Sequence, residues 1–530
     1  MRIIPTCPVD LSGPPRAPRA PTPTPASAAP AHAASGPASF VLDRLPALDG
    51  VAPADAAEAF RDLPGLALLE SVRPGRAGRW SILVADPVDV LVGASGGRDP
   101  FAAARRALAR LDRTRIPVGT APFAGGLVGH LGYDLGRRFE TVPGRATDDQ
   151  GLPDLHLGLH TWAVTWNRRD GRAWVAGRAL DADAAGLARA IAEVRERAAA
   201  VGRAFVGGEA SGRGAGIAEL PPIPPLVFVS GTDRTAWDAG VAAVRAAIAA
   251  GELYQANLAR RLAASFAGDP WTIFRRLRAG EPAAFAAYLD LGEQPGTRSP
   301  GRHAAGGGRR VPHEGRRRAI ISASPEPFVS LDAAGRVRAD PIKGTRPRGQ
   351  TRAEDRALAA DLLASPKDRA ENTMIVDVLR NDLGRVCQPG SVGAPRLWRL
   401  ERAASVQHLV STITGRLAPG RDAFDLLAAT FPGGSVTGAP KIRAMALIEA
   451  LEPVRRGPYC GAALWMDAAG AMGSSILIRT FVADGQRLTL HVGGGIIWRS
   501  DAEAEWEETR AKAAGPLRAI SGRDVGEEER

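Results

Sequence analysis

Short apolar runs separated by turn residues dominate the first globular part of the chain, which begins near Ser39. The runs FVLDRL, LALLES, WSILVADPVDVLVG and GLVGHLGYDLG are typical of strands. TWAVTWN and AWVAGRAL predict a further pair of strands, and the alanine-rich stretch from Asp181 to Ala200 predicts a helix. This part of the chain is therefore expected to be rich in sheet and to end in a helix.

A Gly/Pro-rich stretch, GGEASGRGAGIAELPPIPP, follows at 207–225 and predicts a linker. We divide the chain into a Pro/Ala-rich, disordered N-terminus (1–38), an N-terminal subdomain (39–206), the linker, and a C-terminal domain (226–520). The first 38 residues lack the apolar core of a secretory signal, so a disordered lead-in and a start site placed too early both remain open. No run of about 18 apolar residues predicts a membrane span.

Helical and strand patterns alternate in the second half. TDRTAWDAGVAAVRAAIAA predicts a helix that breaks at Gly251 and is followed by a strand. AENTMIVDVLRNDLGRV predicts a helix with Glu371 at its start. A basic, Gly-rich insertion at 292–318 is expected to be a mobile surface loop joining two strands. It has no aromatic residues on which bases would stack.

Composition changes this picture little. The chain has 530 residues, of which 45% are hydrophobic, enough for a large core or for two or three domains. Its net charge of +11 leaves a nucleic-acid-binding protein as an alternative, although a composition rich in Ala, Gly, Pro and Arg explains the charge more simply. Cys7, Cys387 and Cys460 form neither a metal-ligand spacing nor a disulfide framework, so we expect a reducing cytoplasm.

Two glycine-rich segments indicate a site for a small anion. FPGGSVTGAPKIRAM runs from a glycine turn into a helix with Pro440 near its first position, and such a helix start exposes backbone N–H groups. HVGGGIIW is a strand interrupted by glycines, where a ligand can approach the backbone closely. Arg479 is expected on an adjacent strand, and its planar guanidinium suits a carboxylate.

Acidic helices add a possible metal site. Glu505 and Glu508 lie three residues apart on one predicted helical face, and Glu371 lies on another helix. Carboxylates from two helices suit Mg²⁺, but charged surface helices with i,i+4 pairs explain the same pattern. His408, in the apolar strand VQHLVSTITGRL, is either a structural residue or a candidate general base.

Lysine is scarce, which makes one lysine conspicuous. The chain has 68 Lys and Arg residues, of which only four are lysine: Lys343, Lys367, Lys441 and Lys512. Lys343 lies in PIKGTRPRG among arginines. A lysine amine can lose its proton and act as a nucleophile, whereas arginine stays protonated. The choice of lysine at this position therefore suggests a chemical role.

Ordered motifs across roughly 250–515 resemble one enzyme family. They are YQANLARRL, SASPEPF, PIKGTRPRG, ENTMIVDVLRNDLGRV, VQHLVSTITGRL, FPGGSVTGAPKIRAM, GPYCGA, ILIRTF and GGGIIWRSDAEAEWEETRAKA. Together they are similar to the chorismate-utilising enzymes, which include component I of anthranilate synthase and of aminodeoxychorismate synthase, isochorismate synthases and salicylate synthases. The resemblance implies an α/β (α+β) fold of the anthranilate synthase component I type: two packed antiparallel sheets flanked by helices, with an N-terminal subdomain.

The resemblance also implies roles for individual residues. It makes Glu371 and Glu508, with Glu505 beside them, ligands of a Mg²⁺ cofactor that binds the ring carboxylate of chorismate. It makes Glu326 the general acid for the departing 4-hydroxyl and places His408 near the ring. The remaining residues that it assigns to substrate binding are Gly344, Thr345, Ser435, Lys441, Tyr459, Arg479, Gly493, Gly494 and Gly495.

Two positions in the family pattern favour amination. Aminodeoxychorismate synthases carry lysine at the position of Lys343, where anthranilate synthases usually have alanine. The family mechanism implies that Lys343 attacks C2 and that ammonia then gives 4-amino-4-deoxychorismate for 4-aminobenzoate and folate. Gln255 stands where water-using relatives carry an activating lysine, so ammonia is the expected nucleophile.

The sequence also leaves other outcomes open. The chain carries no glutaminase nucleophile, so a separate glutamine amidotransferase, in a heterodimer, or free ammonium is expected to supply ammonia. Anthranilate synthase component I, or an enzyme of secondary metabolism that forms an aminobenzoate, is the alternative function. LLES resembles the region where relatives bind tryptophan, but apolar packing with a polar turn explains it equally well.

Overall fold

The computed structural model describes residues 37–73, 78–93, 99–206, 220–294, 316–402, 406–523 and 527–528. Antiparallel pairing joins most of its strands into two large sheets. The first sheet, called sheet A here, contains, in order of hydrogen bonding, β1 (Phe40–Arg44), β8 (Arg172–Arg178), β7 (Trp162–Asn167), β3 (Trp80–Val84), β2 (Ala67–Glu70), β11 (Phe285–Gln294), β12 (Arg316–Ser324), β21 (Thr480–Asp484), β22 (Arg487–Ile496), β10 (Gln255–Ser265), β9 (Phe228–Ser230) and β23 (Glu527–Glu528), with β18 (Gly438–Ala439) also paired to β10.

In the second sheet, called sheet B here, the strand that carries Lys343 stands at one end of the strand order. It contains β15 (Ile342–Pro347), β17 (Val406–Arg416), β14 (Arg336–Ala339), β13 (Pro327–Leu331), β20 (Met472–Ile476), β19 (Ala462–Asp467), β5 (Gly126–Leu131), β6 (Leu155–His160) and β4 (Asp89–Val92), with β16 (Gly393–Arg402) also paired to β17. The expected fold class, two packed antiparallel sheets flanked by helices, is confirmed.

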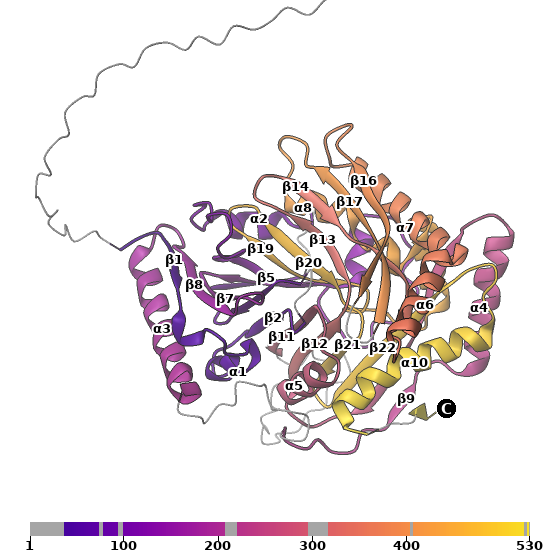
Figure 1. The fold of residues 1–530 in the computed structure, drawn as a ribbon, viewed down its shortest axis with the longest axis horizontal. Helices are drawn as coiled ribbons and strands as arrows, with labels where there is room; N and C mark the ends of the chain where they lie inside the picture. The colour runs from indigo at the N-terminus through magenta and orange to yellow at the C-terminus, as the bar shows by residue number, and fades with distance from the viewer. Residues whose placement is uncertain are drawn as a thin grey trace, which may run out of the picture. The chain divides into compact units, whose positions relative to one another are not determined.

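Helices cover the outer faces of the sheets (Figure 1). They are α1 (Pro53–Ala57), α2 (Ala102–Ala109), α3 (Ala184–Val206), α4 (Arg234–Ala249), α5 (Pro270–Gly280), α6 (Arg352–Ala364), α7 (Pro366–Gly384), α8 (Ala423–Thr430), α9 (Lys441–Leu451) and α10 (Ala502–Ser521), with short 3₁₀ turns η1 (Pro46–Leu48), η2 (Glu58–Phe60), η3 (Tyr133–Arg138) and η5 (Gly434–Val436). None of the helices in these described ranges is long and apolar enough to cross a membrane.

Capping residues explain where several helices begin. Asp233, Asp269 and Asp501 each accept a backbone N–H at the start of α4, α5 and α10. Ser365 caps α7 in the same way and is followed by a proline at the first helical position. The α7 helix therefore starts five residues before Glu371, which corrects the expectation that Glu371 lies at the helix start.

Apolar side chains from both sheets pack together over part of the space between them. Ile82, Ile320 and Val482 of sheet A pack in one cluster with Val128 and Ala463 of sheet B. Burial of apolar surface of this kind is the main favourable term in folding. The cluster fixes the two sheets face to face, and with them the strands that carry the candidate site.

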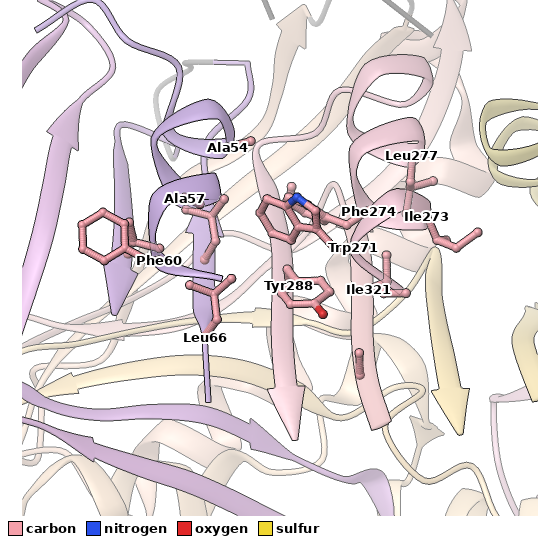
Figure 2. Close-up of a cluster of buried hydrophobic side chains, with 14 of the residues drawn as sticks. Ala54, Ala57, Phe60, Leu66, Trp271, Ile273, Phe274, Leu277, Tyr288 and Ile321 are labelled. Carbon is pink, nitrogen blue, oxygen red and sulfur yellow. The ribbon is translucent and has the colours of Figure 1, made fainter. Parts of the chain in front are cut away.

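A second core shows how early and late parts of the chain combine. In Figure 2, side chains from α1, η2 and the turn before β2 lie beside Trp271 and Phe274 of α5 and Tyr288 of β11. The Trp271 and Tyr288 rings meet edge to face, with centroids 4.9 Å apart. Residues from Ala38 onward group into one compact unit, and both sheets mix strands from before and after the expected linker.

Most local expectations from the sequence are confirmed. Strands form at β1, β2, β3, β4 and β5, the pair β7 and β8 is antiparallel, and β11 pairs with β12 around the insertion. The helix expected over Asp181–Ala200 instead spans Ala184–Val206. The expected disordered N-terminus and most of the linker and of the 292–318 insertion lie outside the described residues. The boundaries at 39–206 and 226–520 stay a prediction.

Candidate active site

A bulge in β15 sets the direction of Lys343. The pairing register between β15 and β17 shifts between Lys343 and Thr345, at Gly344. Gly344 has φ +77°, and an added Cβ would lie 2.9 Å from the side chains of Asp368 and Leu362. The Lys343 ammonium donates a hydrogen bond to the carbonyl oxygen of Ser435 at 3.1 Å.

Glu326 lies beside this lysine, at the turn between β12 and β13. Its side chain is buried, and burial raises the pKa of its carboxyl, while Lys343 and the Ser435 hydroxyl oppose that rise. A buried carboxyl with a raised pKa is suited to hold a proton and donate it. The structure therefore brings together a candidate acid, Glu326, and a candidate amine nucleophile, Lys343.

Carboxylates from two helices lie next to this pair. Burial raises the pKa of Glu371, on α7, and of Glu505, on α10, and the charge of Glu508 adds to both shifts. Burial acts in the same direction on Glu508, but Lys512 and Lys367 outweigh it and leave its pKa lowered. A bound cation would relieve the charge repulsion between these carboxylates.

Lysines and a serine hold these carboxylates in place. Lys512 lies 2.7 Å from Glu508, Lys367 lies 3.9 Å from Glu371, and the Ser500 hydroxyl donates to Glu505 at 2.6 Å. Mg²⁺ in proteins commonly takes one or two carboxylates and completes its shell with water and substrate oxygens, which this donor set fits. Within the ranges that the structure describes, no three His, Cys, Asp or Glu side chains are grouped to hold a metal ion.

The glycine strand β22 runs directly beneath these carboxylates. A Cβ at Gly494 would lie 3.1 Å from Glu505, and a side chain at Gly493 or Gly495 would collide with β10. Lys512 donates to the carbonyl oxygen of Gly493 at 2.8 Å and so joins α10 to this strand. Glycine is needed here because the backbone itself must approach its neighbours closely.

Gln255 begins β10 and faces Gly495. Its side chain is 2% exposed, and its amide oxygen has no hydrogen-bond partner among the described residues. A buried polar atom without a partner is costly unless a ligand or a water satisfies it. Gln255 is therefore placed to receive a hydrogen bond at the edge of the site.

His408 lies on β17, the strand paired with β15, and the charge of Arg479 acts on it. Thr345 and His408 face each other across β15 and β17, with 2.9 Å between the hydroxyl and Nδ1. Burial lowers the pKa of His408 to about 4, with a contribution from Arg479, so the ring is neutral at pH 7. Arg479 precedes β21 at φ +51°, which corrects its expected place on a strand, and it pairs with Glu281 at 3.5 Å.

Tyr459 lies next to a fully buried ion pair, Arg456–Glu452. Its ring stacks on His491 with centroids 5.1 Å apart, and the Arg456 guanidinium lies 5.6 Å from the ring centroid. Arg456 pairs with Glu452 at 2.6 Å and donates to the carbonyl oxygens of Val436 and Asn257. Sequence reasoning missed this pair, because the chain leaves α9 at Glu452 and the helical i,i+4 rule does not apply to LEPVRRG.

Lys441 does not join the other candidate residues. Its ammonium pairs with Asp382 of α7 at 2.6 Å and donates to the Thr430 carbonyl oxygen at 2.9 Å. Pro440 caps α9 rather than occupying its first turn, so Lys441 starts the helix and points towards α7. The structure gives Lys441 a place in helix packing, and its expected site role stays a prediction.

A cavity of about 910 Å³ lies between the sheets, and neither Lys343 nor Glu326 lines it. Its lining includes Ser71 of LLES, Trp80 and Phe328. The carboxylate of Glu70, also in LLES, is paired with Arg278 at 2.7 Å. LLES therefore borders a cavity large enough for a small molecule as well as contributing to the packing.

The chain belongs to the chorismate binding enzyme family, whose model matches residues 67–518. It is a chorismate-utilising enzyme of that family. It is 38% identical over 445 residues to aminodeoxychorismate synthase component 1 of Salmonella typhimurium, covering 81% of this chain and 87% of the relative. It is also 38% identical over 456 residues to anthranilate synthase component 1 of Streptomyces coelicolor, covering 86% and 83% of the two chains.

A solved structure supports the same fold. Anthranilate synthase component I from Streptococcus pneumoniae superposes with a TM-score of 0.68 at 29% identity, covering 85% of this chain and 93% of that one. The two sheets and their flanking helices are therefore the architecture of this enzyme family.

We predict that Glu452→Ala lowers the free energy of unfolding by about 3–5 kcal/mol, because it leaves the Arg456 charge buried and unpaired. Urea denaturation followed by circular dichroism measures the change. Glu193→Ala is the control: it removes an exposed i,i+4 pair with Arg197 and is expected to cost about 0.5 kcal/mol or less. Equal, small effects of both substitutions would contradict the importance of the buried pair.

Proposed function

We propose that this enzyme aminates chorismate with ammonia to give 4-amino-4-deoxychorismate, a transaminase-type reaction that leads to 4-aminobenzoate and folate. The observation that carries the proposal is the position of Lys343 beside the buried Glu326. The relative from Salmonella typhimurium named aminodeoxychorismate synthase component 1 supports the same activity.

In the proposed reaction the neutral amine of Lys343 attacks C2 of chorismate. Glu326 gives its proton to the 4-hydroxyl, which leaves as water, because hydroxide itself is a poor leaving group. Ammonia then adds at C4 and expels the lysine amine, so the net change is chorismate and ammonia to product and water. The carbonyl of Ser435 orients the amine before attack, and burial, which raises the pKa of Glu326, favours the protonated acid.

The other candidate residues bind and orient the substrate in this proposal. Arg479, Tyr459 and the backbone of 493–495 hold the enolpyruvyl carboxylate, since a guanidinium and backbone N–H groups suit that anion. Gly344 and Thr345 contact the ring, with neutral His408 behind them. Gln255 carries a carboxamide where a general base would activate water, which favours ammonia as the nucleophile.

Glu371 and Glu508, with Glu505 beside them, are the proposed holders of Mg²⁺. The ion would supply positive charge for the ring carboxylate of chorismate. Lys512 and Lys367 would release the carboxylates that they now pair. The ammonia is proposed to come from a separate glutamine amidotransferase, since the relatives are named component 1, and the setting is proposed to be the cytoplasm.

Product identification tests the function. Purified protein is mixed with chorismate, Mg²⁺ and ammonium at mildly alkaline pH, with and without added aminodeoxychorismate lyase, and products are read by mass spectrometry. We expect 4-aminobenzoate only with the lyase, and none from Lys343→Arg, which keeps the charge but not the nucleophile. Lys367→Arg is the matched control and should remain active. Anthranilate formed without the lyase would instead support the function of the Streptomyces coelicolor relative.

Calorimetric titration of Mg²⁺ in the presence of chorismate and without ammonia tests the metal site. Glu371→Gln or Glu508→Gln should raise the dissociation constant at least about tenfold, because each removes a charged ligand. Glu507→Gln is the control, since Glu507 pairs with Arg510 on the exposed side of α10. A dissociation constant unchanged in both variants would rule these carboxylates out as ligands.

A further inference from the structure

Two parts of the candidate site must keep a fixed separation. In the proposed reaction Glu371 and Glu508 hold the ring carboxylate of chorismate through Mg²⁺, while Lys343 attacks C2 of the same ring. Burial raises the pKa of Glu371, and the nearby charge of Lys343 opposes that rise. Glu371 belongs to α7, whereas Lys343 belongs to β15. Contacts between α7 and sheet B therefore decide where the two groups stand relative to each other.

The side chain of Asn372, the residue after Glu371, is 0% exposed and points from α7 into sheet B. Its Nδ2 donates to the carbonyl oxygen of Leu409 on β17 at 3.4 Å, and its Oδ1 accepts the Ser411 hydroxyl at 2.5 Å. Figure 1 shows α7 alongside β16 and β17. Leu409 is the residue that pairs with Lys343 between β17 and β15. One side chain thus joins the helix of Glu371 to the strand position opposite Lys343.

The hydrogen bonds of Ser411 fix the orientation of this amide. The Ser411 hydroxyl oxygen accepts the backbone N–H of Trp398 at 3.1 Å, so the hydroxyl hydrogen is directed to Asn372. The Asn372 oxygen therefore faces Ser411, and its NH₂ group faces the Leu409 carbonyl, which can only accept. We call these four groups, the Trp398 N–H, Ser411, Asn372 and the Leu409 carbonyl, the anchor network. Each donor in it meets an acceptor in this one arrangement.

The anchor network begins at a strained residue. Trp398 has φ +52°, in the left-handed region, where a bulky side chain is an outlier. It lies in the bulge of β16 between Arg396 and Arg399, and its ring packs 5.2 Å from the Arg369 guanidinium of α7. Strained backbone persists only where surrounding contacts hold it, and it is common at functional sites. Here the strained residue is the one whose N–H directs the Ser411 hydroxyl.

Two other polar contacts hold α7, but neither is buried at the level of Glu371. Asp368 contacts Arg346 of β15 at 3.2 Å, and the Arg346 side chain is 27% exposed. Asp382 is paired at the start of α9, about three helical turns further along. Asn372 is therefore the buried contact that is placed to set the position of Glu371.

We propose that Asn372 is a positioning residue, which through the anchor network sets the place of Glu371 relative to Lys343. The inference rests on the proposed function, since it takes Glu371 as a holder of Mg²⁺ and Lys343 as the nucleophile. Asn372 acts through α7 and does not itself touch the substrate. Without it the first turns of α7 shift against β17, and the ring held at the metal is no longer aligned with the attacking amine. A displacement of about 1 Å can cost about a hundredfold in rate.

Metal binding and bond formation are measured separately. Mg²⁺ is titrated calorimetrically into the full-length chain with chorismate and without ammonia, and the mass gained by the peptide that contains Lys343 is followed over time. Asn372→Ala should raise the Mg²⁺ dissociation constant about three- to tenfold, less than the loss of a group that binds a metal ligand directly. It should also slow the mass gain about tenfold or more at saturating Mg²⁺, because added metal does not restore the alignment. Alanine favours helix, so the substitution does not itself break α7.

Ser411→Ala tests the same connection from the strand, and it serves also if Asn372→Ala fails to fold. It should change both measurements in the same direction. Because each substitution breaks one network, the double variant should be little worse than Asn372→Ala alone. Ile375→Val is the control for stability, since it trims a fully buried side chain of α7 and leaves the anchor network intact. Thr373→Ala, on the exposed side of α7, is the neighbouring control, and both controls should behave as wild type.

Wild-type Mg²⁺ binding and mass gain in the Asn372→Ala and Ser411→Ala variants would overturn the positioning role. Equal losses in Ile375→Val would also overturn it, since they would assign the effect to the stability of α7. Fully additive losses in the double variant would show that the two residues act independently and that the anchor network does not exist as a unit. The proposed function fails separately, if the wild-type chain gains no mass at Lys343 or if Glu371→Gln leaves Mg²⁺ binding unchanged.

Discussion

The buried ion pair between Glu452 and Arg456 is the constraint on which the site depends. Glu452, at the end of α9, accepts the backbone N–H of Ala259 in β10, while Arg456 donates to the carbonyl oxygens of Val436 and Asn257. One pair thus joins a helix end, a central strand and the η5 turn beneath Tyr459. Two buried charges are tolerated only when each finds its partners, so the pair specifies one arrangement of these segments.

The fold brings the reacting groups together from both sheets. Sheet B carries Lys343 and His408, and sheet A carries Gln255 and the glycines of β22. The helices α7 and α10 add the carboxylates from outside the sheets. Strands from the first 178 residues complete both sheets, so the early part of the chain supports the site without supplying its candidate residues. A bulge at Gly344 and the bare backbone of β22 then provide the close approach that a small substrate needs.

Local periodicity predicted most strands and the helices around Glu371 and Glu508, because those patterns depend on near neighbours in the chain. It did not predict that both halves share each sheet, since strand pairing between distant segments leaves no local signal. Lys441 shows the same limit: its motif matches the family, but at the start of α9 its side chain points to Asp382 of α7. Arg479 lies just before β21 in a left-handed backbone conformation, and nothing in ILIRTF indicates that conformation.

The central claim is that the Lys343 amine forms a bond to the substrate, and a mass measurement on the protein tests it most directly. The enzyme is mixed with chorismate and Mg²⁺ without ammonia, quenched, and analysed as intact protein and as peptides. The account predicts a mass gain of one chorismate less one water on the peptide that contains Lys343, and no gain in Lys343→Arg. An enzyme that aminates chorismate when ammonium is supplied but never shows this adduct would contradict the claim.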